Sequence, residues 1–201
     1  MKKLLTLLVA FTTYGLSSQT TGSEHLEKGN SKANLKDYYG AIADYTKATE
    51  IDPNYAAAYY NRGNAKRELK DYYGAIADYT KFIEIDPNGA DAYYNRGNVK
   101  RELKDHYGAI ADYTKAIEID PNDADAYCNR GISKASLKDY YGAIADYTKA
   151  TEIDPNYANA YVNSGNSKEQ IGDANGACSD WKKATKLGHK QATKWVRDQC
   201  N

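Results

Sequence analysis

The stretch AAAYYNRGNAKRELKDYYGAIADYTKFIEIDPNG, from Ala56 to Gly89, decides the fold because it recurs along the chain. All four prolines of the 201-residue sequence lie 34 residues apart. They are Pro53, Pro87, Pro121 and Pro155, and the same step relates Gly29, Gly63, Gly97, Gly131 and Gly165. A fixed period of this length predicts a solenoid, in which each unit buries its apolar face against its neighbours.

Each repeat contains two segments with helical spacing. In residues 59–69 the positions i, i+4 and i+7 share one face, and the same spacing returns in residues 75–85. We expect Asp71-Tyr72-Tyr73-Gly74 to form the turn between these two helices. Asp86 precedes a proline and should leave the α region, which would end the second helix. Asn88 and Asp91 could then cap the next helix with their side-chain oxygens. The unit is therefore predicted to be a helical hairpin.

The repeat resembles the tetratricopeptide repeat, whose pattern of aromatic, glycine, alanine, aromatic and proline is matched by Tyr59, Gly63, Ala75, Tyr79 and Pro87. The match covers about 170 of the 201 residues. The resemblance implies an all-α, right-handed superhelical solenoid of five antiparallel helix pairs. We place the units at 22–55, 56–89, 90–123, 124–157 and 158–191, and a C-terminal capping segment at 192–201. The capping helix itself is expected to run from Gln191 to Cys200.

Two positions depart from the family pattern. Arg62 stands where the family has leucine, and Lys66 stands where it has tyrosine. A polar group in a packing position needs a partner, and Asp78 recurs in each unit just before the second-helix aromatic residue. We therefore expect an ion pair of the Arg62 to Asp78 type inside the unit, with the long side-chain stem covering apolar surface.

The first residues follow a different pattern. Met1 to Ser18 has two lysines, a short apolar run and then small residues, which is typical of a secretory signal peptide cleaved near Ser17 or Ser18. The apolar run is too short to span a bilayer, and no long apolar segment follows in the mature chain. The expected location is the periplasm or the medium. The alternative is a leading amphipathic helix packed on the first unit.

The charge balance excludes one class of partner. The chain has 27 basic and 27 acidic residues, whereas nucleic-acid binding needs clustered positive charge. We therefore expect no nucleic-acid partner. The pattern fixes no oligomeric state.

The three cysteines are expected to differ. Cys178 and Cys200 lie on either side of the Gly188 turn, so antiparallel helices would bring them to the same end. In an oxidising compartment they would form a disulfide that pins the capping helix to the last unit; the alternative is two buried thiols. Cys128 is expected to be a small surface-lining residue without a partner.

Nothing in the repeat indicates catalysis. The three histidines fall at unrelated places, and no pair of cysteines or histidines has metal-ligand spacing. Residues copied into several units usually serve the unit, so the repeated carboxylates are not candidate catalysts. We expect no enzyme activity, no metal and no cofactor.

Binding is better supported. The resemblance implies that the first helices line a concave groove that holds a peptide or a partner's helix. Beside the packing stripe these helices carry aromatic and basic residues in the middle units and more apolar residues further along. The predicted partner-binding residues are Tyr60, Asn64, Arg67, Tyr94, Asn98, Arg101, Cys128 and Ile132. Tyrosine and arginine are enriched in binding hot spots.

The sequence therefore predicts a non-catalytic protein-interaction scaffold whose partner is a protein or peptide with acidic and apolar segments. Three alternatives stay open. The groove side chains could simply be solvated, or the chain could be a self-associating structural component of the cell envelope that uses its ends or outer tyrosines. The third alternative is an enzyme with an unrecognised site.

Overall fold

The computed structural model describes residues 21–200, and every regular element within that range is an α-helix. The all-α solenoid predicted from the repeat is confirmed. The helices are α1 (Gly22–Asn34), α2 (Tyr38–Ile51), α3 (Ala56–Glu68), α4 (Tyr72–Ile85), α5 (Ala90–Glu102), α6 (His106–Ile119), α7 (Ala124–Ser136), α8 (Tyr140–Ile153), α9 (Ala158–Gln170), α10 (Ala174–Lys186) and α11 (Lys190–Gln199).

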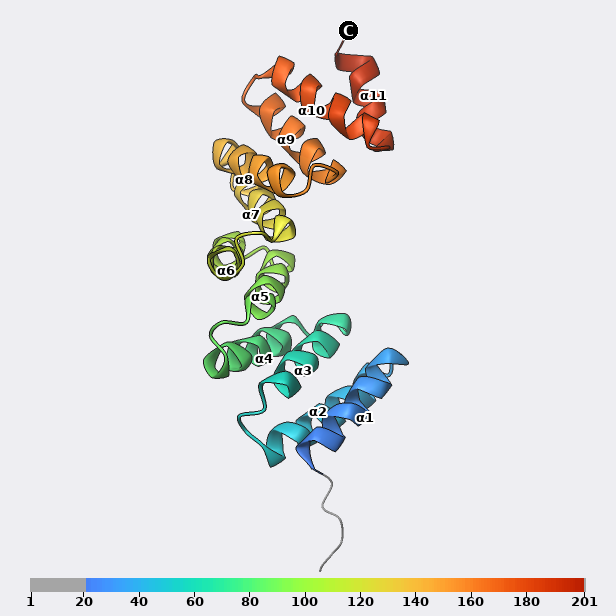
Figure 1. Ribbon diagram of the computed structural model, residues 1–201, viewed down its shortest axis with the longest axis vertical. Helices are drawn as coiled ribbons and strands as arrows, with labels where there is room; N and C mark the ends of the chain where they lie inside the picture. Colours follow the sequence, from blue (N-terminus) through green and yellow to red (C-terminus); the bar gives the residue numbers. More distant parts are fainter. Residues whose placement is uncertain (1–20, 201) are drawn as a thin grey trace, which may run out of the picture.

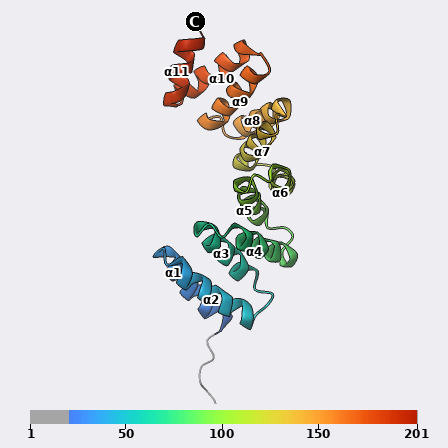
Figure 2. The ribbon, with the colours of Figure 1, turned by 180° about the vertical axis from the view of Figure 1, so that it is seen from behind.

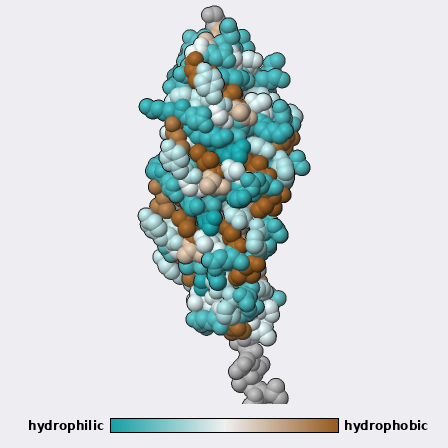
Figure 3. All heavy atoms as spheres, turned by 90° about the vertical axis from the view of Figure 1, so that its left-hand side faces the viewer, coloured by the Kyte–Doolittle hydropathy of each residue, from teal (hydrophilic) through white to brown (hydrophobic). Residues whose placement is uncertain are grey.

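The helices stack along one long axis, with α1 and α2 at one end and α10 and α11 at the other (Figure 1). In both ribbon views each first helix lies beside the second helix of its own unit, as α3 does beside α4 and α5 beside α6 (Figure 2). Buried side chains form a series of small clusters between successive helices instead of one central core. On the face seen in Figure 3, hydrophobic residues appear as patches separated by hydrophilic ones.

The second helix of each unit has defined ends. Asp71 is the N-cap of α4, and its Oδ1 accepts a hydrogen bond from the backbone N–H of Gly74 at 3.1 Å. A Cβ on Gly74 would lie 2.2 Å from Asp71 Oδ2, so a larger residue here would require the capping carboxylate to shift. At the other end Asp86 is extended, with φ −125° and ψ 91°, as expected for a residue before proline.

The turn inside the unit lies earlier than predicted. Because Asp71 caps α4, Tyr72 and Tyr73 belong to the first turn of that helix, and the predicted turn at Asp71 to Gly74 is wrong. The left-handed residue is Lys70, with φ 61°. In the fifth unit glycine occupies this position, as Gly172 with φ 83°, and this is the sequence signal that marks the turn.

The predicted capping of α5 by Asn88 and Asp91 is also wrong. Gly89 is the N-cap of α5 and makes no side-chain cap bond. Asn88 instead donates its backbone N–H to Asp86 Oδ1 at 3.1 Å, and Asp91 lies inside the first turn of α5, where a carboxylate favours the helix dipole. The side chain of Asp86 closes the loop, so Asn88 is not needed as a cap.

A second-helix aromatic ring packs on the first-helix glycine. Tyr113 is fully buried, and a Cβ on Gly97 would lie 2.9 Å from its ring carbon Cε1. The Tyr113 hydroxyl donates to Asn98 Oδ1 at 2.7 Å, and burial raises its pKa. In the fifth unit Trp181 replaces the tyrosine and donates its indole N–H to Asn166 at 3.1 Å. The glycine of the repeat thus leaves the space into which a large aromatic ring packs.

The predicted ion pair is confirmed, and it contains an additional lysine. Arg62 donates through Nε and Nη2 to the two carboxylate oxygens of Asp78, at 2.9 and 2.6 Å. Lys66 Nζ lies 2.7 Å from the same carboxylate. Equivalent triads occur in the next two units, formed by Arg96, Lys100 and Asp112 and by Arg130, Lys134 and Asp146.

The same arginine also connects neighbouring units. Arg62 Nη1 donates to the hydroxyls of Thr46 and Thr49 in the preceding helix α2, both at 3.1 Å. Its guanidinium lies over the Tyr59 ring, 5.2 Å from the centroid. One side chain therefore fixes both the interior of its unit and the contact with the unit before it.

The terminal units keep the lysine that pairs with the repeated aspartate but lack the arginine of the triad. Asp44 contacts His25 Nδ1 at 3.3 Å and Lys32 Nζ at 2.6 Å. Burial alone would raise the pKa of Asp44, but the hydrogen bonds from Lys32 and His25 hold this pKa below its ordinary value. In the fifth unit Lys168 pairs with Asp180 at 2.7 Å.

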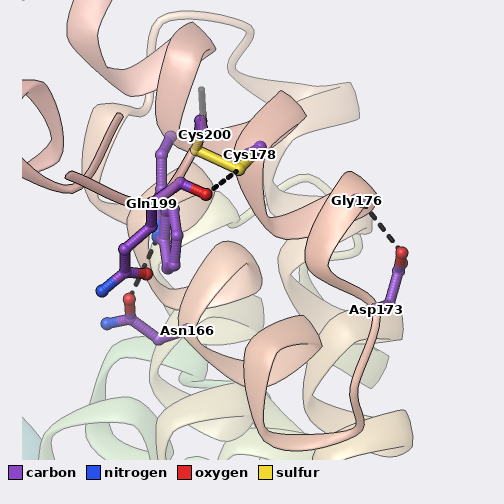
Figure 4. The surroundings of a disulfide bond; sticks show 7 residues. Asn166, Asp173, Gly176, Cys178, Gln199 and Cys200 are labelled. Carbon is purple, nitrogen blue, oxygen red and sulfur yellow. Dashed lines mark hydrogen bonds between the residues drawn. A yellow bond between two sulfur atoms is a disulfide. The ribbon is translucent and has the colours of Figure 1, made fainter. Parts of the chain in front are cut away.

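A covalent bond holds the last helix in place. Cys178 on α10 and Cys200 after α11 form a disulfide, with an S–S distance of 2.05 Å and a Cα–Cα distance of 5.5 Å (Figure 4). The Trp195 ring of α11 packs on Trp181, with centroids 5.4 Å apart. The capping helix begins at Lys190, slightly earlier than the predicted start near Gln191 or 192, because the ring nitrogen of His189 caps it.

The expected signal peptide, Met1 to Ser18, lies outside the described residues. Within residues 21–200 no helix has both the length and the apolar character needed to cross a membrane.

Candidate functional site

The first helices of neighbouring units form one continuous face of the solenoid. We call it the groove face and define it by the positions of Tyr60, Asn64 and Arg67 in α3 and their equivalents in α1, α5, α7 and α9. Each unit contributes the same three positions because the 34-residue period keeps the helices in register. Differences between units at these positions therefore set the local chemistry of the face.

The two predicted groove tyrosines connect units. Tyr60 is half-buried, and its hydroxyl accepts a hydrogen bond from Asn95 Nδ2 of the next unit at 2.9 Å. Tyr94 accepts in the same way from Asn129 at 2.9 Å. Burial raises the pKa of both phenols above its ordinary value. These tyrosines build the wall of the groove face and are not free side chains, and their contact with a partner stays a prediction.

The predicted asparagines are oriented by the core. Asn64 Oδ1 accepts from the hydroxyl of Tyr79 at 2.7 Å, and Asn98 Oδ1 accepts from Tyr113 at the same distance. Because each carbonyl oxygen is fixed in this way, the orientation of each side-chain amide is set. The second helices therefore position polar groups on the groove face through the buried tyrosines.

The two predicted arginines differ in the hydrogen bonds that their guanidinium groups make within the chain. Arg67 Nη1 donates to Asn95 Oδ1 at 2.9 Å, and its Nη2 donates to Glu68 at 3.3 Å. Arg101 has one salt bridge, a longer contact of 3.9 Å with Glu102. Within residues 21–200 its Nε is buried and has no hydrogen-bond partner.

The prediction that Cys128 lines the surface is wrong. Its side chain is 2% exposed and belongs to the cluster of Ala143 and Tyr147. Burial raises the pKa of the thiol, with smaller contributions from its neighbours. A small thiol here packs between α7 and α8, where the second and third units place tyrosine. Ile132 is half-buried and lines a pocket of the groove face.

Two pockets open on the groove face at equivalent places. One lies between the first and second units and has a volume of about 400 Å³. The other lies between the fourth and fifth units, has a volume of about 530 Å³, and gains a wall from Trp195 of the capping helix. Ala33 lines the first pocket, and Ala135 lines the second at the same position of the repeat.

Arginine takes this position in the middle of the solenoid. Arg67 and Arg101 are the equivalents of Ala33 and Ala135. The guanidinium of Arg67 reaches Asn95, whose equivalents Asn61 and Asn163 line the two pockets. The long side chain therefore occupies space that alanine leaves open. Sequence reasoning missed these pockets, although the change from arginine to alanine at a groove position was a signal for them.

A third pocket, of about 490 Å³, lies where the loops of the central and fourth units meet. It is lined by the carboxylates of Asp91, Asp120, Asp123, Asp125 and Asp154. Burial raises the pKa of Asp123. In the described part of the chain no group of three or more histidine, cysteine or acidic side chains has an arrangement that could hold a metal ion.

Sequence comparison identifies the repeat. A family profile described as tetratricopeptide repeat matches residues 90–123 and 124–157. A second, described as TPR repeat, matches residues 29–67 and 63–103. A comparison with curated proteins found no match.

Solved structures with the same fold cover most of the chain. A crystal structure of MamA is 30% identical, covers 82% of this chain and 96% of its own, and has a TM-score of 0.78. Another crystal structure of MamA is 28% identical over 86% of this chain and 94% of its own, with a TM-score of 0.80. YrrB, described as a TPR protein with an unusual peptide-binding site, is 23% identical over 90% of this chain and 93% of its own, with a TM-score of 0.79.

Proposed function

Because this chain belongs to the tetratricopeptide repeat family, a family that generally serves as a non-catalytic interaction domain, we propose that it is a protein-interaction scaffold that holds an extended segment of a partner on its groove face. The observation that carries the proposal is the pair of equivalent pockets on that face. The likeness to YrrB, which is described as having a peptide-binding site, supports it. We also propose that the chain has no catalytic activity of its own.

The pockets suit side chains of a partner. Each is open to solvent and is bounded by fixed amides and half-buried aromatic rings, a mixture that suits recognition of a peptide. Asn61 and Asn64 border the first pocket, and Asn163 and Asn166 border the second. Such amides can hydrogen-bond a peptide backbone while the apolar wall accepts a side chain.

Filling both pockets should weaken binding strongly while leaving the fold intact. We expect the double variant Ala33→Arg, Ala135→Arg to lose at least about tenfold in affinity for its partner, because the added side chains would occupy both pockets. The fold should accept them, since Arg67 and Arg101 stand at the same position in the middle units. Affinity capture from the native source, followed by titration of the captured partner, measures the change.

The matched control carries the same charges on the opposite side. Ala43 and Ala145 are exposed on second helices α2 and α8, so the variant Ala43→Arg, Ala145→Arg adds two arginines away from the groove face. It should retain the partner at unchanged affinity. Equal capture by both double variants would contradict a groove-binding scaffold and favour an outer-surface contact.

We also propose that the chain is exported. The pattern of Met1 to Ser18 supports export, and so does the Cys178–Cys200 disulfide, because disulfides persist in oxidising compartments. Protein isolated from its native source should have the intact mass of a chain cleaved near Ser17 or Ser18 and oxidised at these cysteines. An unprocessed chain with free thiols would contradict export.

A further inference from the structure

Three consecutive first helices present different chemistry at one groove position. Arg101 on α5, Ala135 on α7 and Glu169 on α9 are equivalent residues of successive units. Neighbouring first helices contact one another, so these positions follow each other along the groove face. Along the groove face these three positions therefore present a cation, an open pocket and an anion in turn.

The cation in this series has no close carboxylate partner among the described residues, although its side chain lies near the Tyr113 hydroxyl. Arg101 is 27% exposed, its salt bridge to Glu102 is 3.9 Å long, and its Nε is buried without a partner among the described residues. Glu102 itself is largely exposed, and a contact of that kind contributes little. Arg67, by contrast, donates hydrogen bonds to Asn95 and Glu68. Arg101 is therefore better placed than Arg67 to take a carboxylate from outside.

The pocket at Ala135, between the fourth and fifth units, suits an apolar side chain. Ile132, Ala135 and Trp195 supply apolar wall, and the amides of Asn163 and Asn166 lie at its border. Trp195 comes from the capping helix, which the Cys178–Cys200 disulfide joins to α10. The wall is thus held in place without any partner present.

The anion stands on the far side of the same pocket. Glu169 is exposed and lines the pocket, and none of the salt bridges within residues 21–200 involves its carboxylate. Its neighbour Lys168 is already paired with Asp180 at 2.7 Å. A cation supplied by a partner would therefore meet Glu169 without competing with a bond of this chain.

We propose that the partner presents an extended segment with an acidic residue opposite Arg101, an apolar residue in the pocket at Ala135, and a basic residue opposite Glu169. This inference rests on the proposed groove-binding function and specifies its ligand. Packed helices lie about 8–10 Å apart, and an extended chain advances about 3.3 Å per residue. The three side chains are therefore spaced about three residues apart, in the order acidic, apolar, basic along the groove.

The test is selection from a phage-displayed library of random dodecapeptides on the oxidised wild-type protein. Selected peptides should share the acidic, apolar and basic order at steps of about three residues. Their affinities, measured by fluorescence anisotropy with synthetic labelled peptides, should fall about tenfold with Arg101→Gln and about tenfold with Glu169→Gln. Lys115→Gln removes an exposed cation from second helix α6, outside the groove face, and as the control should change affinity less than about threefold.

A charge reversal sharpens the test. Selection on Glu169→Lys should replace the basic residue of the consensus by an acidic one and leave the other two positions unchanged. Peptides that bind wild type and are lost with Ala33→Arg, Ala135→Arg, but show no such order or respond to neither charge, would overturn this inference and leave the proposed function standing. Enrichment of no peptide, or of peptides indifferent to the filled pockets, would overturn both.

Discussion

Asp112→Ala should lower the free energy of unfolding by about 3–5 kcal/mol, because it leaves two partly buried cations without their counter-charge. Asp112 is 3% exposed. Its carboxylate accepts hydrogen bonds from Arg96 at 2.9 and 2.7 Å and lies 2.7 Å from Lys100. Urea denaturation followed by far-UV circular dichroism measures the loss.

Two controls separate charge from packing. Asp112→Asn keeps the size of the side chain and should lose nearly as much as alanine. Glu118→Ala breaks the exposed pair with Lys115, 2.7 Å long, and should cost no more than about 1 kcal/mol. Replacing the whole triad by apolar residues, as Arg96→Met, Lys100→Met, Asp112→Leu, should recover most of the stability. A loss with Asp112→Ala as small as that of Glu118→Ala would show that the triad does not stabilise the unit.

Removing the disulfide should cost about 3 kcal/mol, because a bond across a separation of 22 residues restricts the unfolded chain. The loss should concentrate at the end of the solenoid, since each unit contacts only its neighbours. In the variant Cys178→Ser, Cys200→Ser we expect hydrogen exchange to accelerate in α11 while the middle helices keep their protection. Oxidised wild type is the reference.

Reduction of the wild-type protein provides a control for the disulfide prediction. Dithiothreitol should reproduce the effect in wild type and do nothing further to the double serine variant. Equal exchange of residues 190–199 in oxidised and reduced protein would contradict the assigned role. Because Trp195 forms a wall of the groove pocket, loosening of α11 should also weaken peptides that depend on that pocket.

The 34-residue repeat was sufficient to predict the solenoid. One proline, one glycine and one alanine per period indicated paired helices, and the extended Asp86 before Pro87 ended the second helix where predicted. The pairing of Arg62 with Asp78 also followed from sequence, because two polar residues at packing positions of one hairpin require each other. Local rules and the need to satisfy buried charge were enough for these features.

Sequence reasoning failed where one local signal competes with another. Tyr72 and Tyr73 looked like turn residues beside a glycine, yet the Asp71 cap makes them helical and shifts the turn to Lys70. Asn88 looked like a cap, yet the Asp86 side chain closes that loop instead. Each outcome depends on which of two nearby side chains reaches the backbone N–H, and composition does not specify this.

The contacts and pockets of the groove face could not be predicted without the packing of neighbouring units. Tyr60 is hydrogen-bonded to Asn95 in the next unit and Cys128 is buried, although both occupy the same groove position of the repeat. The pocket between α7 and α9 takes its Trp195 wall from α11, which lies far along the chain. Periodicity fixes the face of a helix on which a side chain lies, but its burial depends on the side chains that neighbouring units bring against it, and these vary from unit to unit.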